Sequence, residues 1–176
     1  MQFRPLAIAG AFAVEIEPRE DDRGFFARSF CRQEFAEHGL SPVIAQCNVS
    51  WNRLRGTLRG LHFQRDPHWE AKLVRCTRGA AYDVVVDLRT ASPTYLKWAA
   101  VEISAANRTA VYAPSGFGHG FQTLCDDTEI FYQMSEPFYP ALSGGIRWND
   151  PAIAVEWPIL PPIVSDRDNS FPDFQP

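Results

Sequence analysis

Residues 56–64 read Gly-Thr-Leu-Arg-Gly-Leu-His-Phe-Gln, and residues 114–121 read Pro-Ser-Gly-Phe-Gly-His-Gly-Phe. Each stretch holds one histidine, His62 or His119, in an apolar setting punctuated by glycine, which is typical of the lining of a β-barrel. A barrel interior is normally filled by apolar side chains, so polar groups directed into it need a functional reason. The two stretches therefore predict a barrel with a polar pocket.

The rest of the chain reads mostly as short strands separated by clusters of Gly, Pro, Asn and Asp. The candidate strands are residues 43–49, 71–76, 81–88, 97–103, 109–113 and 129–134. One helix is expected over residues 32–40, ending at Gly39. Evenly spaced strands with one early helix favour a β-sandwich, a jelly roll or a barrel. The proline-rich residues 157–176 are expected to be irregular, with the charged residues 165–168 folding back onto the barrel.

Two local expectations concern polar residues near these strands. Asp83, Val85 and Asp87 share one face of a candidate strand, because side chains alternate along a strand. This alternation predicts a strand that is solvated on its aspartate face. His119 is surrounded by three glycines, which permit tight backbone conformations, so it is expected to lie in a turn.

Length and composition exclude several classes of protein. A chain of 176 residues fits a single domain, residues 1–176. Its net charge of −4 and its lack of Lys or Arg runs argue against binding to nucleic acid or to a membrane surface. No apolar run approaches the ~20 residues that cross a bilayer, and the first residues lack a signal-peptide pattern. The four cysteines form no C-x-x-C pair, so reduced thiols and a cytoplasmic location are expected.

Acid–base chemistry is the first function that these residues suggest. An imidazole with an ordinary pKa of ~6.5 is a natural general base, so His62 is a candidate. A carboxylate that orients the ring would help it, and Asp83, Asp166 and Asp168 are the candidates. The alternative is a core histidine bonded to a backbone carbonyl.

Lys72 and Tyr132 are candidate partners of this base. Lys72 is one of only two lysines, and its ammonium suits a developing oxyanion, although a Schiff base or a surface position is also open. Tyr132 is a potential proton donor, and the alternative is a tyrosine in the barrel wall. A cupin-type metal site is a further alternative, with His62, His68, Glu70 and His119 as candidate ligands. The usual His-x-His pair is missing, however, because Gln64 stands where its second histidine would be, and we predict no metal.

Five segments together resemble the nucleotide-sugar 3,5-epimerases, whose best-known members act on dTDP-4-dehydro-6-deoxyglucose in rhamnose biosynthesis. The segments are residues 58–64, 71–75, 84–89, 114–121 and 145–151, and the resemblance runs from residue 22 to residue 168. It implies an all-β, cupin-like jelly-roll barrel with short peripheral helices. It also implies a homodimer that needs neither a metal nor a cofactor.

The resemblance also implies roles for particular residues. His62, paired with Asp168, would remove a proton next to the 4-keto group, Lys72 would stabilise the enolate, and Tyr132 would protonate the opposite face. The substrate-binding residues would contact the sugar, the phosphates and the base, with Phe26 stacking on the base across the dimer; they are Arg23, Phe26, Gln46, Asn48, Arg59, His119 and Phe138.

The chain departs from the pattern of the family at several positions. The departures are Arg28 for Glu, Cys47 for Asp, Val49 for His, Phe138 for Tyr and Ser143 for Glu. Arg28 and Ser143 bear on which nucleotide is recognised, and Phe138 bears on whether C3, C5 or both are inverted. A mono-epimerase, an enzyme for another nucleotide sugar, a metal-dependent cupin oxygenase or isomerase, and a non-catalytic nucleotide-sugar-binding barrel are the alternatives.

Overall fold

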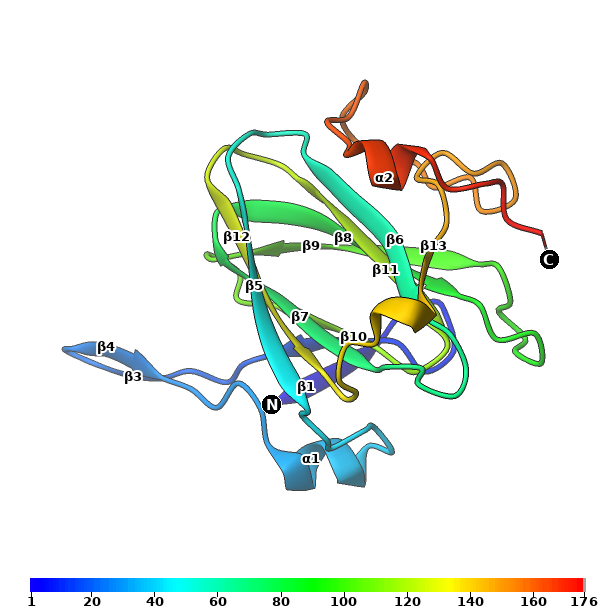
Figure 1. Cartoon of the computed structure of the whole chain (residues 1–176). Helices are drawn as coiled ribbons and strands as arrows, with labels where there is room; N and C mark the ends of the chain where they lie inside the picture. Colours follow the sequence, from blue (N-terminus) through cyan, green and yellow to red (C-terminus); the bar gives the residue numbers. More distant parts are fainter. Residues whose placement is uncertain (176) are drawn as a thin grey trace.

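Two antiparallel sheets pack face to face in the computed structural model, which describes residues 1–175 (Figure 1). The six-stranded sheet has the order β1-β2-β10-β7-β12-β5, and the five-stranded sheet has the order β13-β6-β11-β8-β9. The strands of the first sheet are β1 (Gln2–Pro5), β2 (Phe12–Glu15), β10 (Ala110–Ala113), β7 (Lys72–Arg78), β12 (Thr128–Met134) and β5 (Gln46–Asn52). Those of the second are β13 (Ser143–Gly145), β6 (Leu58–Gln64), β11 (Phe117–Thr123), β8 (Ala80–Asp87) and β9 (Trp98–Ser104).

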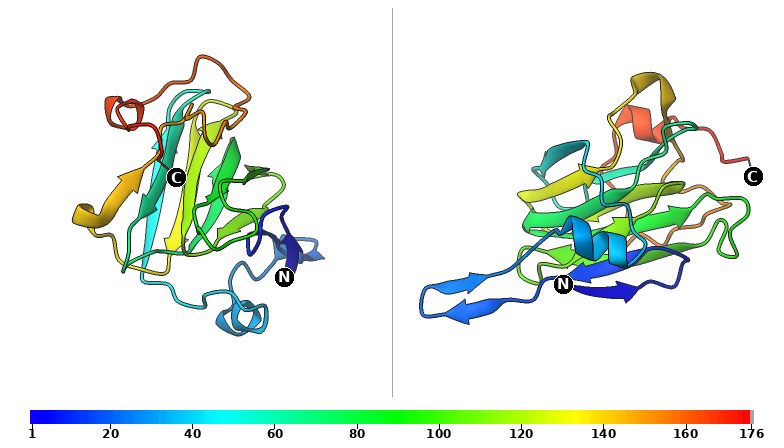
Figure 2. Two further views of the ribbon diagram at one scale, coloured as in Figure 1. Left: turned by 90° about the vertical axis from the view of Figure 1, so that its right-hand side faces the viewer. Right: turned by 90° about the horizontal axis from the view of Figure 1, so that it is seen from below.

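The remaining elements lie outside the two sheets. A hairpin of β3 (Arg19–Asp21) and β4 (Gly24–Phe26) projects away from the body (Figures 1 and 2). The helices are short: α1 (Arg32–Glu37), the 3-10 turn η1 (Pro140–Leu142) and α2 (Asp166–Asn169). The expected cupin-like jelly roll with peripheral helices is confirmed. Within residues 1–175, no helix combines the length and the apolar composition that crossing a membrane requires.

Because side chains alternate along the strands, apolar residues gather in three clusters, one between the sheets and one on the outer face of each sheet. Between the sheets, apolar residues such as Val74, Val85 and Ile130 form the central cluster. A second cluster lies on the outer face of the five-stranded sheet, where Trp157 of the C-terminal tail packs over Val84 and Val86. A third lies under α1 on the outer face of the six-stranded sheet. Each sheet is therefore covered on both faces over part of its area.

The six expected strands and the expected helix are present, and the structure adds β1 to β4, β6, β11 and β13. Three expectations need correction. The strand expected over residues 43–49 lies at Gln46–Asn52, because the preceding residues connect α1 to the sheet without forming a strand. His119 lies inside β11 and is buried; it is not in a turn. Asp83 and Asp87 are also fully buried, because their face of β8 points between the two sheets. The opposite, apolar face of β8 points outward and is covered by the tail.

The C-terminal tail is mostly irregular, as expected, and folds back onto the barrel. Ile163 forms a parallel bridge with Thr57 next to β6. The short helix α2 follows, and the Ser165 side chain caps its start by accepting a hydrogen bond from Asp168 N. This return path brings Asp168 to strand β6, 106 residues from His62 in the chain.

Candidate active site

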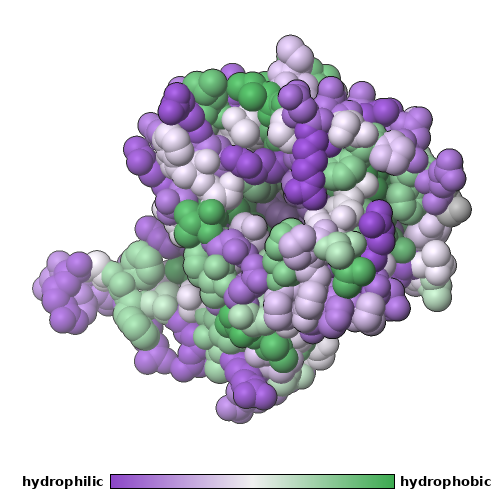
Figure 3. Space-filling view, in the orientation of Figure 1, coloured by the Kyte–Doolittle hydropathy of each residue, from purple (hydrophilic) through white to green (hydrophobic). Residues whose placement is uncertain are grey.

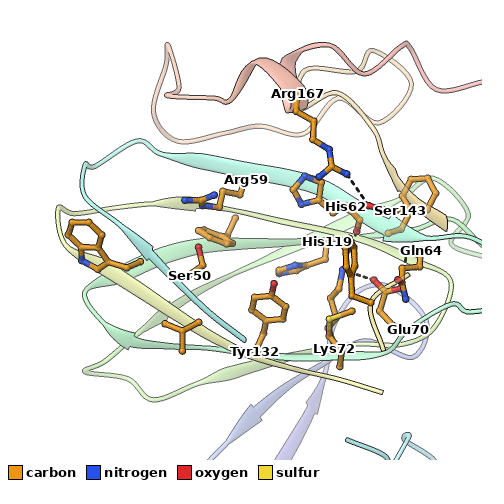
Figure 4. A pocket seen from close by; sticks show the side chains of 16 residues that line it. Ser50, Arg59, His62, Gln64, Glu70, Lys72, His119, Tyr132, Ser143 and Arg167 are labelled. Atoms are coloured by element: carbon orange, nitrogen blue, oxygen red, sulfur yellow. Dashed lines mark hydrogen bonds and ion pairs between the residues drawn. The ribbon is translucent and has the colours of Figure 1, made fainter. Parts of the chain in front are cut away.

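A cavity of about 520 Å³ opens between the two sheets at one end of the barrel. It appears as a hollow near the centre of the face shown in Figure 3. His62 of β6 and His119 of β11 come from the five-stranded sheet, whereas Lys72 of β7 and Tyr132 of β12 come from the six-stranded sheet (Figure 4). The two histidines therefore face the lysine and the tyrosine across the cavity.

His62 forms a pair with Asp168. Its Nε2 lies 2.8 Å from Asp168 Oδ1, and Asp168 Oδ2 accepts a hydrogen bond of 3.1 Å from the backbone N–H of Gly60. Burial raises the pKa of Asp168, but the hydrogen bonds from His62 and from the Gly60 N–H, together with the nearby side chains of His62 and Arg167, lower it below its ordinary value. A carboxylate held on one ring nitrogen leaves the other nitrogen of His62 to act as a base.

A second pair lies beside the first. His119 Nε2 is 2.9 Å from Asp83 Oδ2, and both residues are buried. His119 and His62 are direct neighbours in the antiparallel register of β11 and β6, which places both rings on the same wall of the cavity. Of the three carboxylates expected as partners of His62, Asp168 lies next to it, Asp83 serves His119, and Asp166 is exposed at the start of α2.

Lys72 is buried and forms an ion pair. Its Nζ lies 2.8 Å from Glu70 Oε1 and also donates to the backbone carbonyl of His62 at 3.3 Å. A surface position for Lys72 is therefore wrong. Glu70 in turn accepts a hydrogen bond from the backbone N–H of Gln64 through Oε2. The ammonium is thus held at a fixed place on the cavity floor (Figure 4).

Tyr132 and Arg59 complete the central part of the cavity. Burial raises the pKa of Tyr132, so its hydroxyl keeps its proton at neutral pH. Arg59 Nε donates a hydrogen bond of 2.7 Å to the neutral Asn52 side chain. At the mouth, Arg167 Nη2 donates to the neutral Ser143 hydroxyl at 2.9 Å. The nearby carboxylates Glu70, Asp83 and Asp168 each pair with a basic side chain. Neither guanidinium group forms an ion pair with an acid among residues 1–175, so the cavity suits an anionic ligand.

Not all of the expected binding residues meet in this cavity. Arg59, His119 and Phe138 line it. Gln46 and Asn48 lie next to it on β5, where the Gln46 side chain is engaged by the backbone N–H of Phe138. Arg23 and Phe26 do not line it. Arg23 lies at the tip of the hairpin, and Phe26 on β4 has 76% of its surface exposed.

Among the residues that line the cavity, Gln64 and Arg167 were given no role in binding or catalysis by sequence reasoning, and Glu70 was considered only as a metal ligand. Arg167 adjoins Asp168, so its position in the same charged run was an available signal. Glu70 lies two residues before Lys72, a spacing that places two side chains on one face of an extended chain. Gln64 carried no signal, because its side-chain partners are backbone groups.

The residues considered as metal ligands do not converge. In the part of the chain that the structure describes, no three His, Cys, Asp or Glu side chains are grouped as a metal ion would require. Glu70 is turned to Lys72, and His68 lies beside Glu136. The metal-dependent alternative is therefore not favoured.

A jelly-roll barrel with a histidine–aspartate pair, a buried lysine and a protonated tyrosine around one cationic cavity defines an enzyme that moves protons on an anionic small molecule. The family model for dTDP-4-dehydrorhamnose 3,5-epimerase matches residues 5–176. The dTDP-4-dehydrorhamnose 3,5-epimerase of Sinorhizobium fredii is 41% identical over 175 residues, which cover 99% of this chain and 90% of that protein. The chain belongs to the dTDP-4-dehydrorhamnose 3,5-epimerase family and is an isomerase that acts as an epimerase.

Solved structures of epimerases are also similar to this chain over nearly its whole length. The crystal structure of dTDP-4-dehydrorhamnose 3,5-epimerase from Bacillus anthracis, with TDP and PPi bound, has a TM-score of 0.94 and 38% identity, covering 98% of this chain and 99% of that chain. A 3'-monoepimerase from Streptomyces bikiniensis in complex with dTDP-quinovose has a TM-score of 0.88 and 38% identity, covering 97% and 86%. These two proteins, a 3,5-epimerase and a 3'-monoepimerase, therefore have the same sequence identity to this chain.

Proposed function

We propose that this protein epimerises dTDP-4-dehydro-6-deoxyglucose at both C3 and C5. The observation that carries the proposal is the opposed arrangement of the His62–Asp168 pair and Tyr132 on the two walls of one cavity. A base on one side of a sugar ring and an acid on the other invert a carbon between them. The neighbouring ketone makes the C–H bonds at both C3 and C5 acidic, so one cavity serves both centres.

Each inversion consists of one proton removed and one proton added. His62, oriented by Asp168, takes the proton from the carbon next to the ketone, and the electron pair moves into an enolate. The Lys72 ammonium stabilises the enolate oxygen by a charge-assisted hydrogen bond. Tyr132 then donates its proton to the opposite face of the carbon, and exchange with water restores both side chains. Every group that takes part in these steps belongs to the protein, the substrate or water.

The guanidinium groups of Arg59 and Arg167 and the His119 ring are proposed to hold the substrate's diphosphate and sugar. Arg pairs well with phosphate because its planar fork donates two parallel hydrogen bonds. Arg23 and Phe26 fit this role only if the hairpin of one subunit reaches the cavity of another, so we propose a homodimer. Gln46 and Asn48 keep their proposed contacts with the nucleotide or the sugar.

An exposed apolar face supports the homodimer. On the edge strand β5, Val49 is 62% exposed and Trp51 is 48% exposed, and both lie at the border of the cavity, on the same side of the strand as Cys47. Large exposed apolar residues on one face are typical of an interaction surface. Cys47 and Val49 are two of the departures from the family pattern, and both lie on this face. We also propose a cytoplasmic location, which the four unpaired cysteines support.

NMR of dTDP-4-dehydro-6-deoxyglucose in D2O tests the proposed function. We expect the C3 and C5 proton signals to disappear with the wild-type enzyme, and we expect His62→Asn to slow both losses by about 10²-fold or more. Loss of only one signal would make the protein a mono-epimerase, and no loss with bound substrate would make it a binding protein. No binding at all would direct the search to another nucleotide sugar.

A further inference from the structure

Residues 136–139 form a short strap at the rim of the cavity. The strap leads from β12 in one sheet toward β13 in the other, so it crosses the gap between the sheets beside the cavity (Figure 1). Its residue Phe138 lines the cavity, although about half of its surface is exposed. The position of this ring therefore depends on what holds the strap backbone.

Gln64 on β6 holds the strap by hydrogen bonds to its backbone. This side chain is 2% exposed and lies on β6 two residues after His62. Its Nε2 donates to the backbone carbonyls of Pro137 and His68, both at 3.1 Å, and its Oε1 accepts from the backbone N–H of Tyr139 at 2.6 Å. The two bonds to the strap flank Phe138 on either side.

Further contacts hold the strap at its two sides. Gln46 Oε1 accepts a hydrogen bond of 2.7 Å from the backbone N–H of Phe138. His68 lies 3.2 Å from the Glu136 carboxylate and stacks on the Tyr139 ring with centroids 4.1 Å apart. Gln64 is the buried member of this set, and its loss would leave two backbone groups of the strap without partners.

The chemistry of an amide explains why glutamine suits this position. Among uncharged side chains, only an amide offers two N–H donors together with an acceptor, and Gln64 uses both donors and the acceptor on backbone groups of Pro137, His68 and Tyr139. Buried polar groups that are fully satisfied hold a backbone in one arrangement, whereas an apolar residue of the same size would leave its partners unpaired. Gln64 stands where a metal-binding barrel would have its second histidine, and here the side chain is fully occupied by backbone groups.

We infer that Gln64 is a positioning residue that sets the place of Phe138 against the sugar ring and thereby the balance of reaction at C3 and C5. The part of the inference that concerns the sugar rests on the proposed function. The part that concerns the strap is independent of it.

Amide hydrogen exchange of the free protein tests the strap directly. Gln64→Met should raise the exchange rates of the Phe138 and Tyr139 amides by about tenfold, because bonds that hold this backbone are lost. Gln122→Met is the matched control. Gln122 is also fully buried and also bonds a backbone segment through both ends of its amide, but that segment is at Ile159 in the tail. The strap inference is overturned if the two variants expose the strap amides equally.

Deuterium incorporation at C3 and C5 tests the effect on the sugar. Gln64→Met should change the ratio of the two rates by about threefold or more, while Gln122→Met leaves the ratio unchanged. In a Phe138→Ala background, Gln64→Met should cause no further change in the ratio, because Gln64 acts through that ring. An unchanged ratio in Gln64→Met, or an equal change in both backgrounds, would overturn the inference. Absence of exchange by the wild type would refute the proposed function, and the amide rates would still decide whether Gln64 holds the strap.

Discussion

At the scale of single residues, the site depends on pairing. Asp168 keeps its charge in a buried position because His62 donates to it, and Lys72 is accommodated in the interior because Glu70 lies 2.8 Å away. A buried charge without such a partner would be costly. Tyr132 has no such need, because burial favours its neutral, protonated form. These are the states that a base, an enolate stabiliser and a proton donor require.

Tyr132→Phe should separate proton removal from inversion. His62 remains, so deuterium still enters the substrate from the face of the base, but formation of the inverted product should fall by about 10²-fold or more. NMR distinguishes the two, because retained and inverted sugars differ in their ring couplings. Tyr112→Phe is the control, since Tyr112 is buried outside the cavity with its hydroxyl bonded to Ser41 N–H. Inversion at the wild-type rate in Tyr132→Phe would rule out Tyr132 as the acid.

At the scale of elements, the two strands that carry the histidines approach each other unusually closely. A Cβ on Gly60 of β6 would lie 2.5 Å from the Cα of Gly120 on β11, and Gly60 has a φ of +128°. Gly60 N–H is also the backbone donor to Asp168. Gly60 and Gly120 therefore allow the close contact between β6 and β11 that places His62, His119 and Asp168 together.

Gly60→Ala should destabilise the protein far more than Gly24→Ala. Both glycines have nearly the same φ, +128° and +127°, so both substitutions strain the backbone equally, but Gly24 has open space around it. The clash at Gly60 should add about 2 kcal/mol or more to the loss of unfolding free energy. Urea unfolding of both variants measures the difference. Equal losses would mean that the strands can separate at little cost.

At the scale of the whole molecule, two features outside the cavity lead to predictions about stability and assembly. Asp87 is fully buried and accepts hydrogen bonds from Arg89, Ser92 and Thr94, which ties β8 to the loop before β9. The hairpin β3–β4 projects from the body and exposes Phe26. A single domain over residues 1–176 and a homodimer remain predictions.

Asp87 should make the fold sensitive to acid. Burial alone would raise the pKa of this carboxyl, but the bonds from Arg89, Ser92 and Thr94 lower it from an ordinary 3.8 to about 2. A carboxyl whose pKa is lower in the folded state stabilises the protein above its ordinary pKa and loses that contribution as pH falls. We expect about 2 kcal/mol of stability to disappear between pH 4 and pH 2. In Asp87→Asn this part of the acid-induced loss, measured by chemical unfolding at several pH values, should be missing.

Mixing two variants tests whether the hairpin serves a partner's cavity. Phe26→Ala should raise the KM, and His62→Asn should lower turnover by about 10²-fold or more. In a mixed dimer, one cavity receives His62 from one chain and Phe26 from the other, so the mixture should recover the KM of the wild type at up to about a quarter of its activity. Sedimentation at the same concentrations shows whether dimers exist. Dimers without recovery would show that Phe26 does not act in trans.

The sequence by itself predicted the strands that correspond to β5, β7, β8, β9, β10 and β12, the short helix and the candidate residues, because side-chain alternation and glycine or proline at turns are local properties. Together with the resemblance, it also indicated the family. It did not predict β6 and β11 as strands, since glycine-rich stretches carry little strand preference, and it also missed the short strands β1 to β4 and β13. It also predicted that the aspartates of β8 face water. The apolar face of β8 is covered by the tail, which lies far away in the chain, so nothing in the local pattern indicated that the apolar face is the outer one.

Only the tertiary structure decided which partners meet. Asp168 reaches His62 because the tail returns to β6, Asp83 reaches His119 across two paired strands, and Gln64 holds a strap more than seventy residues further along. Such contacts depend on how distant segments pack, which no local pattern of residues records. The residue types therefore indicated the chemistry of the protein, whereas the pairing of the site residues followed from the closure of the barrel.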